Sequence, residues 1–326
     1  MDAFITHKNV VTSYRDYLSS FLSVADPRIQ SEIQKAFESD GFIPEPLVQF
    51  NPAYKTAESL IELANQNRVH KHLPATIGNY SLYEHQVEAL LKGIDNKGFV
   101  VTSGTGSGKS LTYLSAIFNS IFKQGDEKKK GIKAILVYPM NALINSQEEE
   151  IRKFAANYTK SIGKPFPITF AKYTGQEGSE KREKTKIEEP DIILTNYMML
   201  ELIMTRASES WMRASIQDNL QFLVFDELHT YKGRQGSDVS FLIRRIKNHC
   251  NRKLICIGTS ATMVSEGTPI QKKEAVAQVA STIFGETFSA DQIIQEHLKT
   301  CTSGVFPSAP NLRTAVLNGI NSEDDE

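Results

Sequence analysis

The chain is poor in cysteine and in long apolar runs. Its 326 residues include only 3 cysteines, and this odd number without paired spacing argues against a disulfide framework, a zinc site or an iron–sulfur cluster. No apolar run approaches the roughly 20 residues that a membrane-spanning helix needs, and no secretory apolar segment lies near the N-terminus. We therefore expect a cytoplasmic protein that has no membrane partner.

The chain also lacks an excess of charge of either sign. It carries 37 Lys and Arg against 38 Asp and Glu, which gives a formal net charge of −1. A protein that coats duplex nucleic acid by bulk attraction usually has a basic excess. The balance excludes that mode of binding but leaves open a local contact with nucleic acid along a groove.

Apolar residues near helical spacing predict helices in residues 1–79, which we interpret as a helical accessory region. His70 and His72 lie close together there, but no carboxylate or cysteine stands at ligand spacing, so a structural role is favoured over metal binding. From Tyr80 onward, short runs rich in Val and Ile alternate with longer helical patterns. The predicted strands are 99–102, 134–138, 168–171, 192–195, 222–225 and 254–258. The predicted helices are 111–122, 142–158, 197–205, 237–248 and 273–283.

This alternation predicts an α/β domain over residues 80–290, with a mostly parallel sheet and helices on both faces. Residues 291–326 are predicted to form a linker and an acidic tail. Within them, Asp291–Leu298 is predicted to form one more helix.

A glycine-rich segment follows one apolar run and precedes a predicted helix. Its residues are Ser103, Gly104, Thr105, Gly106, Ser107, Gly108, Lys109 and Ser110. Strand, glycine-rich turn and helix form the context of a phosphate-binding loop, because several backbone N–H groups can then point at one anion near the positive end of a helix dipole. Lys109 can reach the β- and γ-phosphates of ATP, and the Ser110 hydroxyl can ligate Mg²⁺. Ser103 stands where the strict pattern has glycine, which is a mild departure.

A second apolar run, Leu223–Phe225, ends in the adjacent acids Asp226 and Glu227. Asp226 at the carboxyl end of a strand can hold Mg²⁺, and Glu227 can polarise the water that attacks the γ-phosphate. An acidic turn after a strand would be common in isolation. Together with the phosphate loop upstream, it predicts an ATP hydrolase.

With these segments placed, residues 80–285 resemble the first RecA-like lobe of a superfamily 2 helicase. Leu82–Gln86 is similar to the Q motif, which implies that Tyr83 stacks on adenine and that Gln86 hydrogen-bonds its edge. Asp226–His229 is similar to motif II of the DEAH kind, which adds His229 to Lys109, Asp226 and Glu227 as a catalytic residue. Segments similar to motifs Ia and Ib imply contacts with the nucleic-acid backbone through Pro139, Asn141, Gln147, Thr195 and Asn196. A segment similar to motif III implies coupling between nucleotide and nucleic acid through Ser260, Ala261 and Thr262.

A narrower resemblance concerns Tyr138–Leu143, the residues that follow motif II as far as Val239, and Ile283–Gly285. These segments are similar to the YprA-like branch, which holds DNA-repair helicases and the DrmA-type helicases of phage-defence systems. The resemblance implies ATP-driven translocation on nucleic acid, with DNA favoured over RNA.

The chain does not contain the Gln-x-x-Gly-Arg-x-Gly-Arg pattern of a second RecA-like lobe. Since that lobe supplies the arginines that complete the ATP site in this family, we expect the chain alone to bind ATP·Mg weakly and to hydrolyse it slowly. Unwinding would then need a second lobe from a partner subunit or a longer protein. The alternative is a non-catalytic, nucleotide- or DNA-dependent interaction subunit of a phage-defence or repair complex. A P-loop kinase or transporter ATPase would leave Gln86 and the Ser-Ala-Thr triplet unexplained.

Overall fold

The computed structural model describes residues 3–21, 24–38, 53–104, 106–261 and 268–299. The chain divides into two compact units, Met1–Pro52 and Ala53–Glu326. The predictions for Thr105, Thr262, Cys301 and the acidic tail lie outside the described residues.

The described residues of the first unit form two helices, α1 (Ala3–Phe21) and α2 (Pro27–Glu38). Both confirm the helical pattern predicted near the N-terminus. Tyr14 and Phe21 on α1 are exposed, whereas Val11 and Leu18 are half-buried. None of the described helices is both long and apolar enough to cross a membrane.

The second unit is built on a seven-stranded sheet in the order β5-β6-β4-β7-β8-β3-β9, in which every pairing is parallel. Its strands are β3 (Phe99–Thr102), β4 (Ala134–Tyr138), β5 (Phe170–Lys172), β6 (Ile192–Asn196), β7 (Phe222–Phe225), β8 (Ile255–Ser260) and β9 (Ile293–Gln295). Since the strands run the same way, their carboxyl ends share one edge of the sheet. That edge carries every predicted site segment except Leu82–Gln86.

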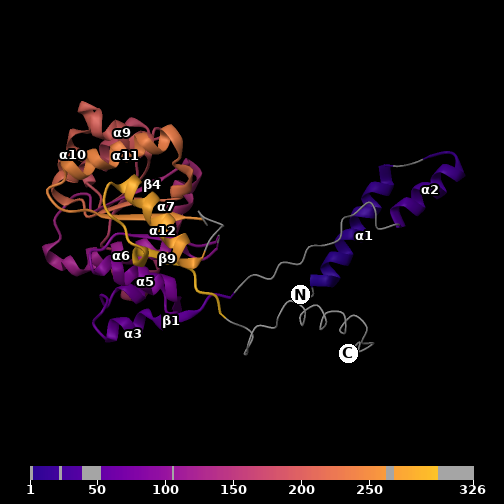
Figure 1. Ribbon diagram of the computed structural model, residues 1–326, viewed down its shortest axis with the longest axis horizontal. Coiled ribbons are helices and arrows are strands. Elements are labelled where there is room, and N and C mark those ends of the chain that lie inside the picture. The colour runs from indigo at the N-terminus through magenta and orange to yellow at the C-terminus, as the bar shows by residue number, and fades with distance from the viewer. Residues whose placement is uncertain (1–2, 22–23, 39–52, 105, 262–267, 300–326) are drawn as a thin grey trace. The chain divides into compact units, whose positions relative to one another are not determined.

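Helices cover both faces of this sheet (Figure 1). They are α5 (Glu84–Ile94), α6 (Lys109–Gln124), α7 (Asn141–Ile162), α9 (Tyr197–Thr205), α10 (Ser210–Asn219), α11 (Gly233–His249) and α12 (Pro269–Phe284). The helix α8 (Ser179–Glu188) buries only Thr185 and belongs to neither core. The core on one face joins α5, α6 and α7, and the core on the other joins α9, α10, α11 and α12. Short 3₁₀ turns occur at η2 (Gly125–Glu127), η3 (Ala207–Glu209), η4 (Leu228–Thr230) and η5 (Ala290–Gln292).

The predicted α/β fold with a parallel sheet is confirmed. Strand residues such as those of β3, β4 and β7 are buried along their whole length, because helices cover them from both sides. The strand predicted at 168–171 lies at Phe170–Lys172, and α10 was not predicted.

The helix predicted at Asp291–Leu298 is wrong. These residues form the end of η5, the strand β9 and the segment that follows it. Ile293 and Ile294 are both fully buried, and Ile293 pairs with Val100 of β3. Adjacent buried residues on opposite faces of a sheet satisfy the period of a strand rather than that of a helix.

The region up to residue 79 does not form one accessory body. Residues 53–79 belong to the second unit, where β1 (Thr56–Ser59) pairs antiparallel with β2 (Ser81–Tyr83). The helices α3 (Leu60–Asn65) and α4 (Leu73–Ile77) follow, and their leucines join the same core as α5 and α6. The apolar spacing identified α3 but not α4, and the burial partners of both helices lie far away in the sequence.

Candidate functional site

The predicted phosphate loop connects β3 to α6, as the pattern requires. Gly106 and Gly108 have φ of +80° and +72°, which favours glycine at both positions. A Cβ at Gly106 would meet nothing within 4 Å, so open space lies beside the loop there. Ser103 and Ser107 share a hydrogen bond of 2.6 Å across the turn. With the first N–H groups of α6 unpaired within their helix, this loop has the geometry of an anion site.

Two carboxylates face this loop from the end of β7. Glu227 Oε1 lies 3.4 Å from the ammonium of Lys109, and both side chains are mostly buried. Glu227 has φ of +53°, an uncommon conformation for a residue with a side chain, and such strain clusters at functional sites. The geometry therefore brings Lys109, Asp226 and Glu227 together as predicted.

Thr259 of β8 is a candidate site residue that the sequence did not identify. Its hydroxyl donates a hydrogen bond to Asp226 Oδ1 and accepts one of 3.2 Å from the Glu227 N–H. Burial raises the pKa of Asp226, and the Glu227 charge raises it further, while the Thr259 hydrogen bond acts in the opposite direction. A buried carboxylate with a raised pKa is suited to a cation that replaces its lost water.

His229 lies beside the acidic pair. Its Nδ1 is 3.2 Å from Glu227 Oε2 and 3.1 Å from the Ser260 hydroxyl. The Ser260 carbonyl also accepts a 3.3 Å hydrogen bond from the Ser103 N–H. Ser260 thus touches both the phosphate loop and the acidic motif, and the half-buried Ala261 follows it.

The predicted base-binding residues lie directly against the loop. The Gln86 amide donates to the carbonyl of Ser107 at 3.2 Å, and its oxygen accepts the Tyr83 N–H at 3.0 Å. The neighbouring His85 is fully buried, contacts the same Ser107 carbonyl through Nε2 at 3.1 Å and stacks on the Tyr83 ring. Burial lowers the pKa of His85. Contact of Tyr83 and Gln86 with adenine stays a prediction.

The residues present fit ATP and Mg²⁺ by the chemistry of their donors. Glu227 Oε2 is buried, and although His229 Nδ1 lies 3.2 Å away, it makes no hydrogen bond within the described part of the chain, so it can accept one from water. The half-buried Ser110 hydroxyl and Asp226 would hold the metal together with phosphate oxygens. No group of three or more His, Cys, Asp or Glu side chains suited to a metal occurs among the described residues. His70 instead stacks on Phe122 at 5.4 Å.

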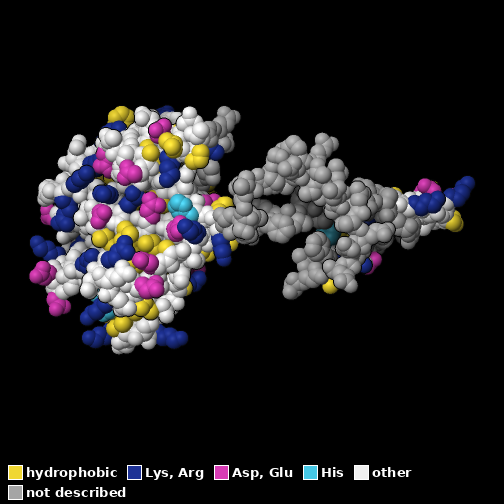
Figure 2. Space-filling view, turned by 60° about the horizontal axis from the view of Figure 1, so that its bottom comes forward, with side chains coloured by type: hydrophobic (Ala, Val, Ile, Leu, Met, Phe, Trp, Pro, Cys, Tyr) yellow, Lys and Arg dark blue, Asp and Glu magenta, His cyan; other side chains and the backbone are white. Residues whose placement is uncertain are grey.

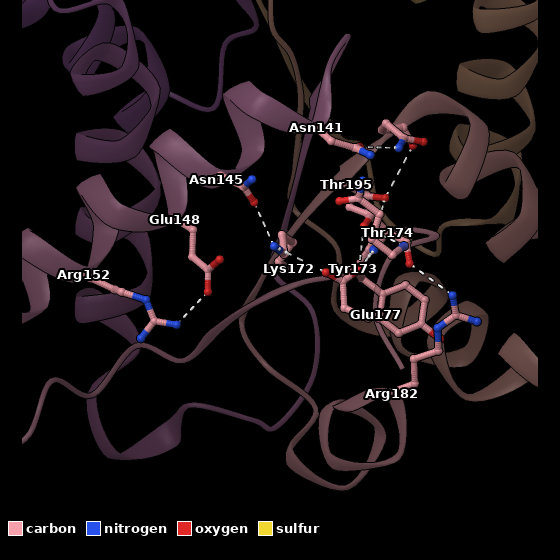
Figure 3. Close-up of polar contacts among 12 residues, drawn as sticks. Asn141, Asn145, Glu148, Arg152, Lys172, Tyr173, Thr174, Glu177, Arg182 and Thr195 are labelled. Atoms are coloured by element: carbon pink, nitrogen blue, oxygen red, sulfur yellow. Dashed lines mark hydrogen bonds and ion pairs between the residues drawn. The ribbon is translucent and has the colours of Figure 1, made fainter. Parts of the chain in front are cut away.

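The residues predicted to contact nucleic acid come from the carboxyl ends of β4 and β6 and from α7, which contains Asn141 and Gln147. Figure 3 shows Asn141 and Thr195. Asn196 donates to Asn141 Oδ1 at 2.9 Å, and its own Oδ1 caps α9 by accepting the Met199 N–H. Thr195 is buried and donates to the Tyr173 carbonyl, so its hydroxyl supports the adjacent loop. Pro139, which follows β4, and Gln147, which lies in α7, are both half-buried.

The sequence did not predict a partly buried polar network in this region (Figure 3). Lys172, at the end of β5, contacts Asn145 of α7 at 2.8 Å and Glu177 at 3.5 Å. Glu177 in turn accepts hydrogen bonds from the N–H and hydroxyl of Thr174. The network fixes the loop that follows β5 against α7. Charges of both signs are mixed over the face of the second unit seen in Figure 2, which agrees with local rather than bulk attraction for nucleic acid.

The comparisons with known proteins agree with this geometry. The family model DEAD/DEAH box helicase matches residues 83–268, more than half of the chain. The chain therefore belongs to the DEAD/DEAH box helicase family. It is 32% identical over 187 residues to the uncharacterized ATP-dependent helicase YprA of Bacillus subtilis, a match that covers 56% of this chain and 23% of that protein.

Two further comparisons extend over more of the chain. The Druantia protein DruE of Escherichia coli is 24% identical across 80% of this chain and 20% of its own length. The crystal structure of the DUF1998 helicase MrfA bound to DNA has the same fold, with a TM-score of 0.60 and 23% identity over 78% of this chain and 31% of that one. The first curated relatives are matched over only 20% to 26% of their lengths. The predicted resemblance to superfamily 2 and its YprA-like branch is confirmed.

Proposed function

We propose that this chain is the ATP-binding lobe of an ATP-dependent DNA helicase or translocase, with ATP and Mg²⁺ as cofactors. The contact between Lys109 and Glu227 carries this proposal most directly. These residues are 118 positions apart, yet the fold brings an ammonium and a carboxylate together between a glycine loop and a strand end. A glycine-rich turn that only caps a helix does not require a lysine in contact with a carboxylate.

Each residue then has a distinct role. Lys109 and the N–H groups from Gly106 to Ser110 bind the triphosphate, while Ser110 and Asp226 hold Mg²⁺. Glu227 accepts a hydrogen bond from the attacking water, and His229 holds the carboxylate in place. When bound, the metal neutralises charge that develops on the phosphate oxygens.

Coupling between nucleotide and nucleic acid is assigned to Ser260, Ala261 and Thr262. Ser260 supports this because its backbone touches the loop and its hydroxyl touches His229. A shift of Glu227 or His229 during hydrolysis would therefore reach β8 and the residues that follow it.

DNA is the proposed nucleic acid. One structural neighbour is a helicase described as bound to DNA. Of the predicted contact residues Pro139, Asn141, Gln147, Thr195 and Asn196, the half-buried Asn141 and Asn196 carry amide groups that can contact a backbone, and the buried Thr195 supports the adjacent loop. We place the protein in the cytoplasm, since Cys250 and Cys256 form no disulfide within the described residues.

A second RecA-like lobe is proposed to complete the motor. An arginine finger is worth roughly 10³–10⁵ in rate in related phosphoryl-transfer enzymes. The matched region covers a minor part of each relative, which is consistent with a single lobe. The isolated chain should therefore hydrolyse ATP slowly, and a partner subunit or a longer protein would supply the missing groups.

A second candidate function is a non-catalytic, nucleotide- or DNA-dependent subunit of a defence or repair complex. The similarity to DruE over 80% of the chain favours a defence role. In this alternative, the lobe would bind nucleotide to control assembly rather than to drive movement.

ATP hydrolysis by the purified chain should be measured with and without single-stranded DNA, with RNA as a comparison. Slow, DNA-stimulated hydrolysis that is lost in both Lys109→Ala and Glu227→Gln supports the motor lobe. Nucleotide binding without hydrolysis, even after addition of a second-lobe protein, supports the interaction subunit. Processive unwinding by the 326-residue chain alone would refute the need for a second lobe.

A further inference from the structure

The phosphate loop is held in place by a residue that lies outside all of the predicted motifs. The Gly104 N–H donates a 2.7 Å hydrogen bond to Glu296 Oε2, although the two residues are 192 positions apart. The strand register explains the contact. Thr102 of β3 pairs with Gln295 of β9, and both are the last residues of their strands. The segments that contain Gly104 and Glu296 therefore leave the sheet side by side.

The segment that contains Glu296 is itself fixed by a short antiparallel pairing, which we call the closing ladder and which consists of Ala53–Lys55 and His297–Lys299. The Lys55 N–H donates to the His297 carbonyl at 2.7 Å, and the Lys299 N–H donates to the Ala53 carbonyl at 2.7 Å. Tyr54 and Leu298 form the bridge between them. Glu296 is thus presented to the loop by an ordered backbone.

The closing ladder also contacts the residues predicted to bind adenine. The Tyr54 ring lies 5.0 Å from the Tyr83 ring and 5.8 Å from the His85 ring, measured between centroids. The Lys55 carbonyl accepts the Glu84 N–H at 3.0 Å, and the Lys55 ammonium pairs with the Glu84 carboxylate at 2.7 Å. The closing ladder therefore supports both the phosphate loop and the ring of Tyr83, which we call the base platform.

Glu296 and Tyr54 meet at Gly104. A Cβ built on Gly104 would lie 3.6 Å from Glu296 Oε2 and 3.8 Å from the Tyr54 hydroxyl oxygen. A carboxylate that accepts a backbone N–H makes a charge-assisted hydrogen bond, which is stronger than a neutral one. Gly104 precedes the N–H groups from Gly106 to Ser110 that would bind phosphate, so Glu296 can hold the loop without occupying that cradle.

We propose that Glu296 is a positioning residue for the phosphate loop, and that it fixes the distance between this loop and the Tyr83 base platform through the closing ladder. The inference rests on the proposed ATP site and deepens it. Glu296 itself does not contact nucleotide. It lowers the cost of ordering the loop when the triphosphate binds.

Calorimetric titration of ATP·Mg into three variants distinguishes a positioning role of Glu296 from an effect of its negative charge alone. Glu296→Ala removes the acceptor and should weaken ATP binding roughly tenfold, since hydrogen bonds to charged groups are worth more than neutral ones. Glu296→Gln keeps an oxygen acceptor of the same shape and should bind within about threefold of wild type. Glu88→Ala is the matched control, because Glu88 lies 4.0 Å from His297 on the same surface but does not touch the loop.

Equal affinities for Glu296→Ala and wild type, tighter binding by Glu296→Ala, or equal weakening of the Ala and Gln variants would each overturn the proposal. Amide exchange of nucleotide-free protein gives a second readout. Exchange at Gly104 should accelerate in Glu296→Ala and stay near wild type in Glu296→Gln and Glu88→Ala. If wild type binds no ATP but Gly104 exchange follows this pattern, the ATP site is refuted and the hydrogen bond between Glu296 and Gly104 is supported. Unchanged exchange at Gly104 in Glu296→Ala refutes the role of that hydrogen bond.

Discussion

The substitution Gly258→Ala should damage both the stability and the acidic motif of this protein. Gly258 lies in β8, where it pairs with Phe225 of β7 on one side and with Val100 of β3 on the other. No free space therefore lies beside it within the sheet. A Cβ at this position would lie 2.2 Å from Leu228 Cδ1 and 3.0 Å from Leu228 Cγ. Leu228 is only 1% exposed and directly follows Glu227. It cannot turn away, so η4 must move.

Overpacking of a filled core costs typically about 1–3 kcal/mol, and we expect Gly258→Ala to lose about 2 kcal/mol of unfolding free energy in urea. Displacement of Leu228 should also move Glu227 away from Lys109 and slow ATP hydrolysis by about tenfold or more. Gly175→Ala is the control, because its Cβ would meet nothing within 4 Å and its φ is not positive. Its stability should stay within about 0.5 kcal/mol of wild type. A Gly258→Ala protein with wild-type stability and hydrolysis would refute this account of the packing under motif II.

Asp226→Asn should stabilise the nucleotide-free protein by about 1 kcal/mol at neutral pH while abolishing Mg²⁺-dependent ATP binding. Because burial raises the pKa of Asp226, its contribution to stability is present at low pH and is lost as pH rises through the folded-state pKa. The stability gap between the two proteins in urea unfolding should therefore close as pH falls, and a gap that widens would contradict the assignment. Asn196→Ala removes the cap of α9 and the bond to Asn141, so we expect about 1 kcal/mol lower stability in thermal unfolding and weaker binding of labelled single-stranded DNA. Unchanged DNA affinity would remove this edge from the nucleic-acid site. For wild type, the logarithm of the DNA-binding constant should fall linearly with the logarithm of salt concentration, and a flat dependence in fluorescence anisotropy would exclude backbone contacts.

The structural context of the candidate site was predicted correctly where it is encoded within short segments. The phosphate loop needs a strand, glycines and a helix start, all within Gly98–Phe118, and these residues specify its shape locally. Asp226 and Glu227 likewise follow their strand directly. The burial of strands on both faces explains why the order of the elements was enough to predict a parallel sheet.

The features missed depend on contacts between distant parts of the chain. Thr259 meets Asp226 only because β7 and β8 are neighbours, and Glu296 meets Gly104 only through the register of β3 and β9. The three-residue strand β9 is too short for periodicity to distinguish it from a helix turn. The burial of residues 53–79 in the second unit follows from the same long-range packing.

Titration of ATP·Mg into the folded chain by calorimetry tests the central claim, that Lys109 and the two acids form a nucleotide site. We expect saturable binding at a single site in wild type and an affinity at least about tenfold lower in Lys109→Ala, because the lysine ammonium is the side-chain cation assigned to the phosphates. No detectable heat of binding in well-folded wild-type protein, or the same affinity in both proteins, would contradict the account.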